Sequence, residues 1–132
     1  MILRGFAAGV VGTCALTVSQ RIEMAVTGRA PSDLPARVAE GVLGISPRGR
    51  RRERVAIAAH WVNNSASGVS RAALGALGLS GPAALAGTFA LYLGGEALLF
   101  RTLDFERSAL RPVDLAHAAV WAVATDAAYE RL

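Results

Sequence analysis

Four long apolar segments alternate with shorter polar stretches along the chain. They run over residues 5–24, 55–79, 83–100 and 113–129. Pro82 and Pro112 directly precede the last two segments, where the missing N–H of proline costs a helix little. A helix of about 17–25 residues crosses a bilayer. We therefore predict an all-α fold, a four-helix transmembrane bundle that forms one domain over residues 1–132.

The connection between the first two segments contains a helical pattern of its own. Leu34, Val38 and Val42 recur every four residues after Ser32. Pro35 is tolerated in this pattern because it would fall in the first helical turn. We predict a short amphipathic helix that lies in the membrane interface.

Composition narrows the class of protein further. Hydrophobic residues make up 53 % of the chain and charged residues only 18 %, which excludes intrinsic disorder and is unusual for a soluble domain. The single cysteine, Cys14, excludes a disulfide framework within the chain and a zinc site built from several thiolates. The net charge of +4 raises the question of nucleic acid, but no groove-entering element with base-reading residues is visible. We expect no nucleic-acid partner.

The basic residues carry a topological signal, because all 14 are arginines and their positions are segregated. In a four-span chain the first and third connections share one side of the membrane. Eleven arginines lie in these two connections or at the adjoining helix end: Arg21, Arg29, Arg37, Arg48, Arg50, Arg51, Arg52, Arg54, Arg101, Arg107 and Arg111. The positive-inside rule places both connections in the cytoplasm and both termini outside.

Polar side chains recur at helical spacing within the apolar segments. One stripe contains Thr88, Tyr92 and Glu96, and such stripes should face the bundle interior because unsatisfied polar groups in hydrocarbon are costly. With the predicted topology, all four segments deliver polar groups to a common depth near the cytoplasmic face. The candidate polar site consists of Gln20, Arg21, Glu23, His60, Asn63, Asn64, Glu96 and His117.

Several functions fit this polar layer. His60, His117 and Glu96 could bind a divalent metal ion, and the two histidines could be axial ligands of a haem within the bundle. Histidine and glutamate could also relay protons in a small transporter. The plainest interpretation is structural, with the polar groups bonded to one another across the bundle. No nucleophile or phosphate-binding motif suggests an enzyme, and no cofactor is required by the sequence.

Two further sets of charged residues stand apart from the polar layer. Arg71 and Asp126 lie deeper, toward the outside, where they could form an ion pair. A run of arginines could bind anionic lipid headgroups at about 1 kcal/mol per residue, or serve only as a topology signal: Arg48, Arg50, Arg51, Arg52 and Arg54. Because a four-helix unit is small for a transport path, we expect a homo-oligomer or a larger membrane complex.

Two stretches of the chain resemble a known family. Residues 59–64, Ala-His-Trp-Val-Asn-Asn, and residues 115–121, Leu-Ala-His-Ala-Ala-Val-Trp, are similar to patterns in the YagU-like family of uncharacterised bacterial inner-membrane proteins. The resemblance covers the second and fourth segments, and Asn63 and Asn64 depart from the family's more aromatic pattern. It implies a multi-pass protein of the bacterial inner membrane, draws attention to His60 and His117, and names no reaction.

Overall fold

The computed structural model describes residues 1–105 and 111–132. Within these residues the chain folds into helices and no strand, so the predicted all-α class is confirmed. The helices are α1 (Ile2–Thr27), α2 (Leu34–Leu43), α3 (Gly49–Ser67), α4 (Val69–Ala76), α5 (Gly81–Thr102) and α6 (Pro112–Arg131). The short helix predicted in the first connection is α2.

Residues with special backbone properties set the helix boundaries. Helix α1 ends at Gly28, whose φ of 71° is the left-handed conformation that glycine adopts without steric cost. Helices α5 and α6 each carry a proline in their first turn, as the sequence predicted. At the start of α6, the backbone N–H of Arg111 donates to the carboxylate of Asp114 at 3.2 Å, which is the carboxylate half of a capping box.

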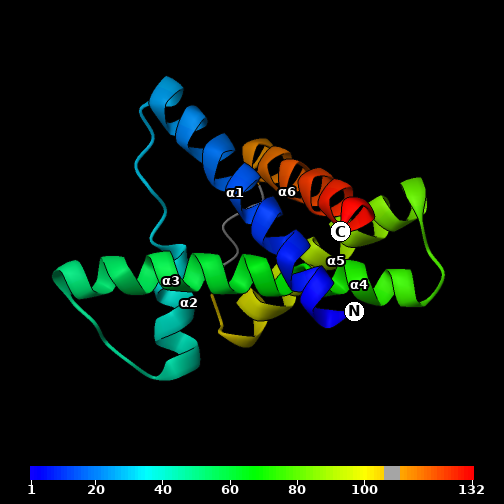
Figure 1. Cartoon of the computed structure of the whole chain (residues 1–132). Helices are drawn as coiled ribbons and strands as arrows, with labels where there is room; N and C mark the ends of the chain where they lie inside the picture. The colour runs from blue at the N-terminus through cyan, green and yellow to red at the C-terminus, as the bar shows by residue number, and fades with distance from the viewer. Residues whose placement is uncertain (106–110) are drawn as a thin grey trace.

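Helices α1 and α6 pack antiparallel, and α3 and α4 run across them as one nearly continuous rod (Figure 1). The N- and C-termini lie at the same end of the α1–α6 pair, where the Arg4 guanidinium donates to the carbonyl oxygen of Tyr129 at 2.6 Å. Helix α5 packs against α4 and α6, and α2 packs against α3. Buried Leu16, Trp121 and Ala122 form the centre of the bundle.

Glycines allow α1 to approach the α3–α4 rod closely. A Cβ atom on Gly68 would lie 2.5 Å from the Cα atom of Gly9, and one on Gly5 would lie 2.8 Å from the Cβ atom of Ala72. Such distances leave no room for a side chain, so the backbones themselves are in contact. Small residues four apart in α1, Gly5 and Gly9, thus permit close helix packing.

The second predicted helix differs most from its expected form. Instead of one helix over residues 55–79, the structure has α3 and α4, which meet at Gly68 where α1 crosses. Helix α3 also begins at Gly49, so the arginine run lies largely within its first turns rather than in a loop. The apolar pattern predicted only the hydrophobic part of this helix. The charged residues before it are also helical, so α3 begins earlier than predicted.

Two helices in the described part of the chain are long and apolar enough to cross a membrane. They are α1 and α5, each with a mean hydropathy of 1.5 over its best 18 residues. The predicted bundle of four membrane-spanning helices is therefore not confirmed, because only these two helices of the described chain qualify as candidate spans. Helix α3 begins with charged turns, and α6 carries Asp114, Asp126 and Glu130 among its small apolar residues.

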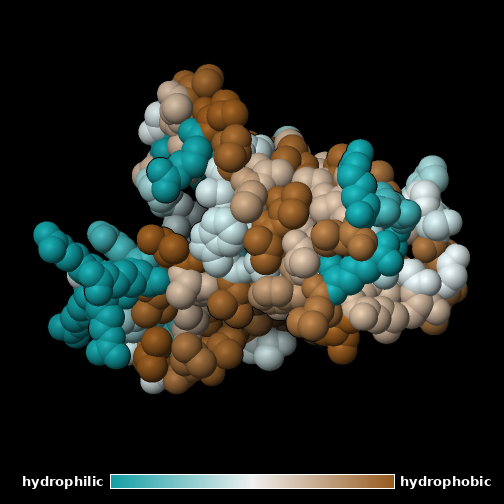
Figure 2. All heavy atoms as spheres, viewed as in Figure 1, coloured by the Kyte–Doolittle hydropathy of each residue, from teal (hydrophilic) through white to brown (hydrophobic). Residues whose placement is uncertain are grey.

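The outer surface of the bundle is rich in large apolar side chains. Val18 and Ile22 of α1, Leu98 of α5 and Val123 of α6 are each more than half exposed. Hydrophobic side chains cover much of the visible face, whereas hydrophilic ones gather at the start of α3 and near the two chain ends (Figure 2). Contiguous apolar surface of this kind is typical of a contact with lipid or with another protein.

Candidate functional site

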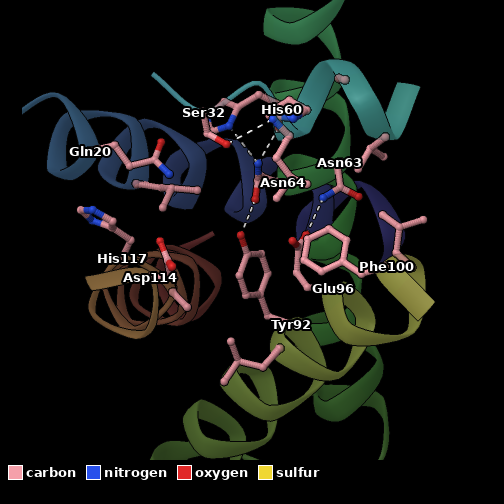
Figure 3. Close-up of a pocket in the computed structure, with 18 of the residues that line it drawn as sticks. Gln20, Ser32, His60, Asn63, Asn64, Tyr92, Glu96, Phe100, Asp114 and His117 are labelled. Carbon is pink, nitrogen blue, oxygen red and sulfur yellow. Dashed lines mark hydrogen bonds between the residues drawn. The ribbon is translucent and has the colours of Figure 1, made fainter. Parts of the chain in front are cut away.

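A single pocket brings together most of the predicted polar site. It has a volume of about 220 Å³ and is bounded by α1, α2, α3, α5 and α6 and by the connection between α1 and α2 (Figure 3). Six of the eight predicted residues line it: Gln20, His60, Asn63, Asn64, Glu96 and His117. Residues distant in sequence thus meet at one depth of the bundle.

A chain of hydrogen bonds joins three helices at one end of the pocket. The amide nitrogen of Asn64 lies 3.3 Å from Nδ1 of His60, and Nε2 of His60 lies 3.0 Å from the hydroxyl of Thr17. From α5, the Tyr92 hydroxyl donates to the amide oxygen of Asn64 at 2.6 Å. These contacts fix the His60 ring between α1 and α5.

The Glu96 carboxylate lies beside this chain. The amide nitrogen of Asn63 donates to its Oε1 at 2.9 Å. Within residues 1–105 and 111–132, no arginine or histidine forms an ion pair with Glu96. Arg21, another member of the predicted site, is exposed and does not line the pocket.

His117 occupies the other end of the pocket, on α6. Its Nδ1 is 2.8 Å from the hydroxyl of Ser19, and its Nε2 is 3.9 Å from a carboxylate oxygen of Glu23. Glu23 itself does not line the pocket but pairs with Arg29 at 2.6 Å. The hydrogen bond to Glu23 raises the pKa of the Arg29 guanidinium above its ordinary value.

Several lining residues were not part of the predicted site. Tyr92 lines the pocket, and its ring stacks on that of Trp121 with the ring centroids 4.3 Å apart. Tyr92 stands four residues before Glu96 in the α5 stripe, so the sequence did contain a signal for it. Ser32 and Arg29 enter from the α1–α2 connection, whose path the helical periodicity could not predict.

The histidines and Glu96 do not form a metal-binding cluster. In the described ranges, no three His, Cys, Asp or Glu side chains are close enough together to hold a metal ion. Axial ligation of a haem would require His60 to give up one of its two contacts, since Thr17 and Asn64 engage both ring nitrogens. Metal or haem binding by this network accordingly stays a prediction.

A second polar cluster lies near the chain termini. The buried Arg71 of α4 has its Nε 2.5 Å from a carboxylate oxygen of Asp126, and it also pairs with Glu130. Its guanidinium lies 4.4 Å from the ring centroid of Tyr129, and that of Arg4 lies 4.3 Å from the same centroid. The predicted pairing of Arg71 with Asp126 is present, with partners that the sequence had not suggested.

Comparisons with known proteins add no relative: no family model matches the chain, and no curated protein or solved structure is significantly similar to it. The resemblance to the YagU-like family accordingly stays a prediction.

Proposed function

We propose that this chain is a small multi-pass membrane protein of the bacterial inner membrane that binds a small polar solute in its pocket, as a transporter-like protein. The observation that carries the proposal is the pocket itself. Polar side chains from α1, α3, α5 and α6 converge on one cavity, while the outward faces of these helices are largely apolar. Polar groups gathered inside an apolar bundle are typical of solute pathways in membranes.

The arrangement of the helix ends supports an orientation for this protein. The end of α1, the start of α3, the end of α5 and the start of α6 share one end of the bundle, and both termini lie toward the other (Figure 1). The arginine-rich connections therefore lie on the pocket side. We propose that this side faces the cytoplasm and that both termini lie outside.

The arginines at the start of α3 fit a membrane surface. Cations near a helix N-terminus interact unfavourably with the helix dipole. The arginines at the start of α3 must therefore be stabilised by other interactions. Arg52 is held by Glu40 at 2.7 Å, which raises the pKa of Arg52. The exposed Arg48, Arg50, Arg51 and Arg54 are available to anionic headgroups on the cytoplasmic face.

The size of the pocket limits the solute. Sites for drug-sized ligands commonly occupy about 300–1,000 Å³, and this pocket has about 220 Å³. It therefore suits a molecule of a few heavy atoms. A homo-oligomer would extend the short path that one chain provides across the bilayer.

A structural role is the second candidate. It is favoured by the hydrogen bonds that already join Thr17, His60, Asn64 and Tyr92 across three helices. In this interpretation the protein is a subunit of a membrane complex, and the polar groups only fix the helices relative to one another.

The topology is tested by cysteine labelling. In a Cys14→Ser background, Ser46→Cys in the α2–α3 connection and Ser80→Cys in the α4–α5 turn are treated with a membrane-impermeant maleimide. We expect Ser46→Cys to react only in inside-out vesicles and Ser80→Cys only in spheroplasts. Labelling of both positions from the same side, or release of the protein by carbonate, would contradict the proposed topology.

Solute binding is tested with the fluorescence of Trp121, which stacks on the pocket residue Tyr92. In a Trp61→Phe background, at least one small solute should change this fluorescence saturably. Filling the pocket with Ala59→Leu should abolish the change, whereas Ala58→Leu should not, because Ala58 is exposed and lies outside the pocket. If no solute has an effect, the structural role is the better explanation.

A further inference from the structure

We infer that the solute is a small primary ammonium ion and that Glu96 is its counter-ion. The inference rests on the proposed function, because it specifies the chemistry of the same pocket. It follows from the balance of charge around the cavity, the direction of the hydrogen bonds and the nature of the walls.

The arginines that line the pocket in the described residues are already paired with carboxylates. Arg29 pairs with Glu23 at 2.6 Å, and the Nε of Arg111 pairs with Asp114 at 3.2 Å. Glu96 also lines the cavity, yet its contact in the described residues is an amide, that of Asn63. Among the residues that the structure describes, the pocket thus has no unpaired arginine for an anion, and it has a carboxylate that a cation would balance.

The hydrogen-bond directions make His60 neutral. Because Tyr92 donates to the amide oxygen of Asn64, the amide nitrogen of Asn64 is the donor toward Nδ1 of His60. Nδ1 is then an acceptor, and the ring proton resides on Nε2. Nε2 donates to the Thr17 hydroxyl, which in turn donates to the carbonyl oxygen of Thr13 at 2.7 Å. Each group in this chain is satisfied without a positive charge on His60, so His60 does not balance Glu96.

The walls of the pocket suit an organic ammonium better than a metal ion. Small divalent cations take about six oxygen ligands, and no suitable cluster exists in the part of the chain that the structure describes. Instead, Tyr92 and Phe100 supply aromatic rings, and Leu93 and Leu99 supply alkyl surface. Aromatic rings attract a desolvated cation, and the alkyl surface can accommodate a short hydrocarbon chain.

The Glu96 carboxylate leaves an acceptor for the ammonium group. Asn63 occupies Oε1, and no hydrogen bond to Oε2 is present within residues 1–105 and 111–132. An ammonium N–H bonded to Oε2 would be charge-assisted, which is the stronger class of hydrogen bond. Figure 3 places Glu96 and Asn63 side by side, with Tyr92 close by.

Three molecules of nearly equal size test the inference: propylammonium, propionate and propionamide. Each is titrated into the full-length Trp61→Phe protein in lipid nanodiscs, with Trp121 fluorescence as the readout. We expect saturable binding of propylammonium, and at least tenfold weaker binding of the other two, about the effect of one charge-assisted hydrogen bond.

Variants assign the effect to Glu96. Glu96→Gln should weaken propylammonium binding at least about tenfold, and Glu96→Asp should restore part of the affinity by keeping the charge. Glu53→Gln removes an exposed carboxylate outside the pocket and should leave binding unchanged. Thermal unfolding of each variant separates a loss of binding from a loss of fold.

The outcomes distinguish the two proposals. Equal binding of all three molecules, or tight propylammonium binding by Glu96→Gln, would overturn the ammonium site and leave a solute pocket in place. Binding of propionate or propionamide alone would do the same. If none of the three binds, the ammonium inference is wrong. If no solute of a broader panel gives a saturable fluorescence change that Ala59→Leu abolishes, the proposed function is wrong as well.

Discussion

Two polar clusters are enclosed by this apolar bundle, one at each end, and they differ in how their charges are balanced. Near the termini, the buried Arg71 is held by Asp126 and Glu130 and covered by the ring of Tyr129. At the arginine-rich end, Glu96 lies beside a cavity and has an amide as its partner in the described residues. The charge of Arg71 is compensated by protein carboxylates, whereas Glu96 has no cation paired with it within residues 1–105 and 111–132.

The difference indicates what each cluster does. A charge that is paired and packed contributes to holding α4 against α6, and removing its partner leaves a buried ion. A carboxylate that borders a cavity without a cation has room and electrostatic reason to accept one. Burial of polar groups alone would not separate these roles, since both clusters consist of polar groups within apolar helices.

The largest effect is expected at the terminal cluster. The Arg71 side chain is only 1 % exposed. Arg71→Ala leaves Asp126 without its cation and removes the packing of the guanidinium against the ring of Tyr129. Loss of one member of a buried ion pair costs about 3–5 kcal/mol. Unfolding in detergent, followed by circular dichroism, should show that the free energy of unfolding falls by this amount.

The control for Arg71 is another arginine at the same end. Arg131 is exposed and its side chain donates to the carbonyl oxygen of Ala127 at 2.9 Å, so Arg131→Ala should change stability by less than about 1 kcal/mol. If Arg71→Ala lowered stability no more than Arg131→Ala, the conclusion that the terminal cluster stabilises the fold would be wrong.

The sequence predicted the members of both clusters better than their contacts. Helical spacing placed His60, Asn64 and Glu96 on inward faces, because residues three and four apart share a face, and the pocket does contain them. Spacing within one helix says nothing about which side chain of another helix is opposite. Thus the pairing of Asn63 with Glu96 was not predicted.

The number of membrane-crossing helices shows another limit of sequence reasoning. Apolar runs located all four segments, but hydropathy and length qualify only α1 and α5 as spans in the described chain. The second segment is split at Gly68, the point where Gly9 of α1 approaches it closely. Such a tertiary contact leaves no periodic trace in the second segment itself. Arg29 and Ser32 reach the pocket from a connection without regular structure. Helical periodicity could not predict their position, because that connection has no periodic pattern.

An intermediate effect is expected for Tyr92→Phe, at the pocket. The substitution keeps the ring stacked on Trp121 but removes the hydroxyl that donates to Asn64 at 2.6 Å. Asn64 is 5 % exposed, so its amide oxygen would lose a buried partner at a cost of about 1–3 kcal/mol.

A double-mutant cycle assigns the effect of Tyr92 to this hydrogen bond. Tyr92→Phe and Asn64→Ala, measured singly and together by chemical unfolding, should show a coupling energy of at least about 0.5 kcal/mol. Additive effects would mean that the Tyr92 hydroxyl does not stabilise the protein through Asn64. The hydrogen-bonded chain from Thr17 to Tyr92 would then not contribute to stability as described.

The smallest effect on stability is expected for Glu96→Gln, and this variant tests the comparison most directly. The glutamine oxygen can still accept the hydrogen bond from Asn63, and no ion pair within the described residues is lost. The change in free energy of unfolding should therefore stay below about 1 kcal/mol, and the removal of a buried charge could make it stabilising. A loss of stability as large as that of Arg71→Ala would mean that Glu96 is held by a protein cation, and the two clusters would then be alike. A stable Glu96→Gln protein that no longer binds propylammonium would instead separate them fully, because the same carboxylate would be dispensable for the fold and required for the ligand.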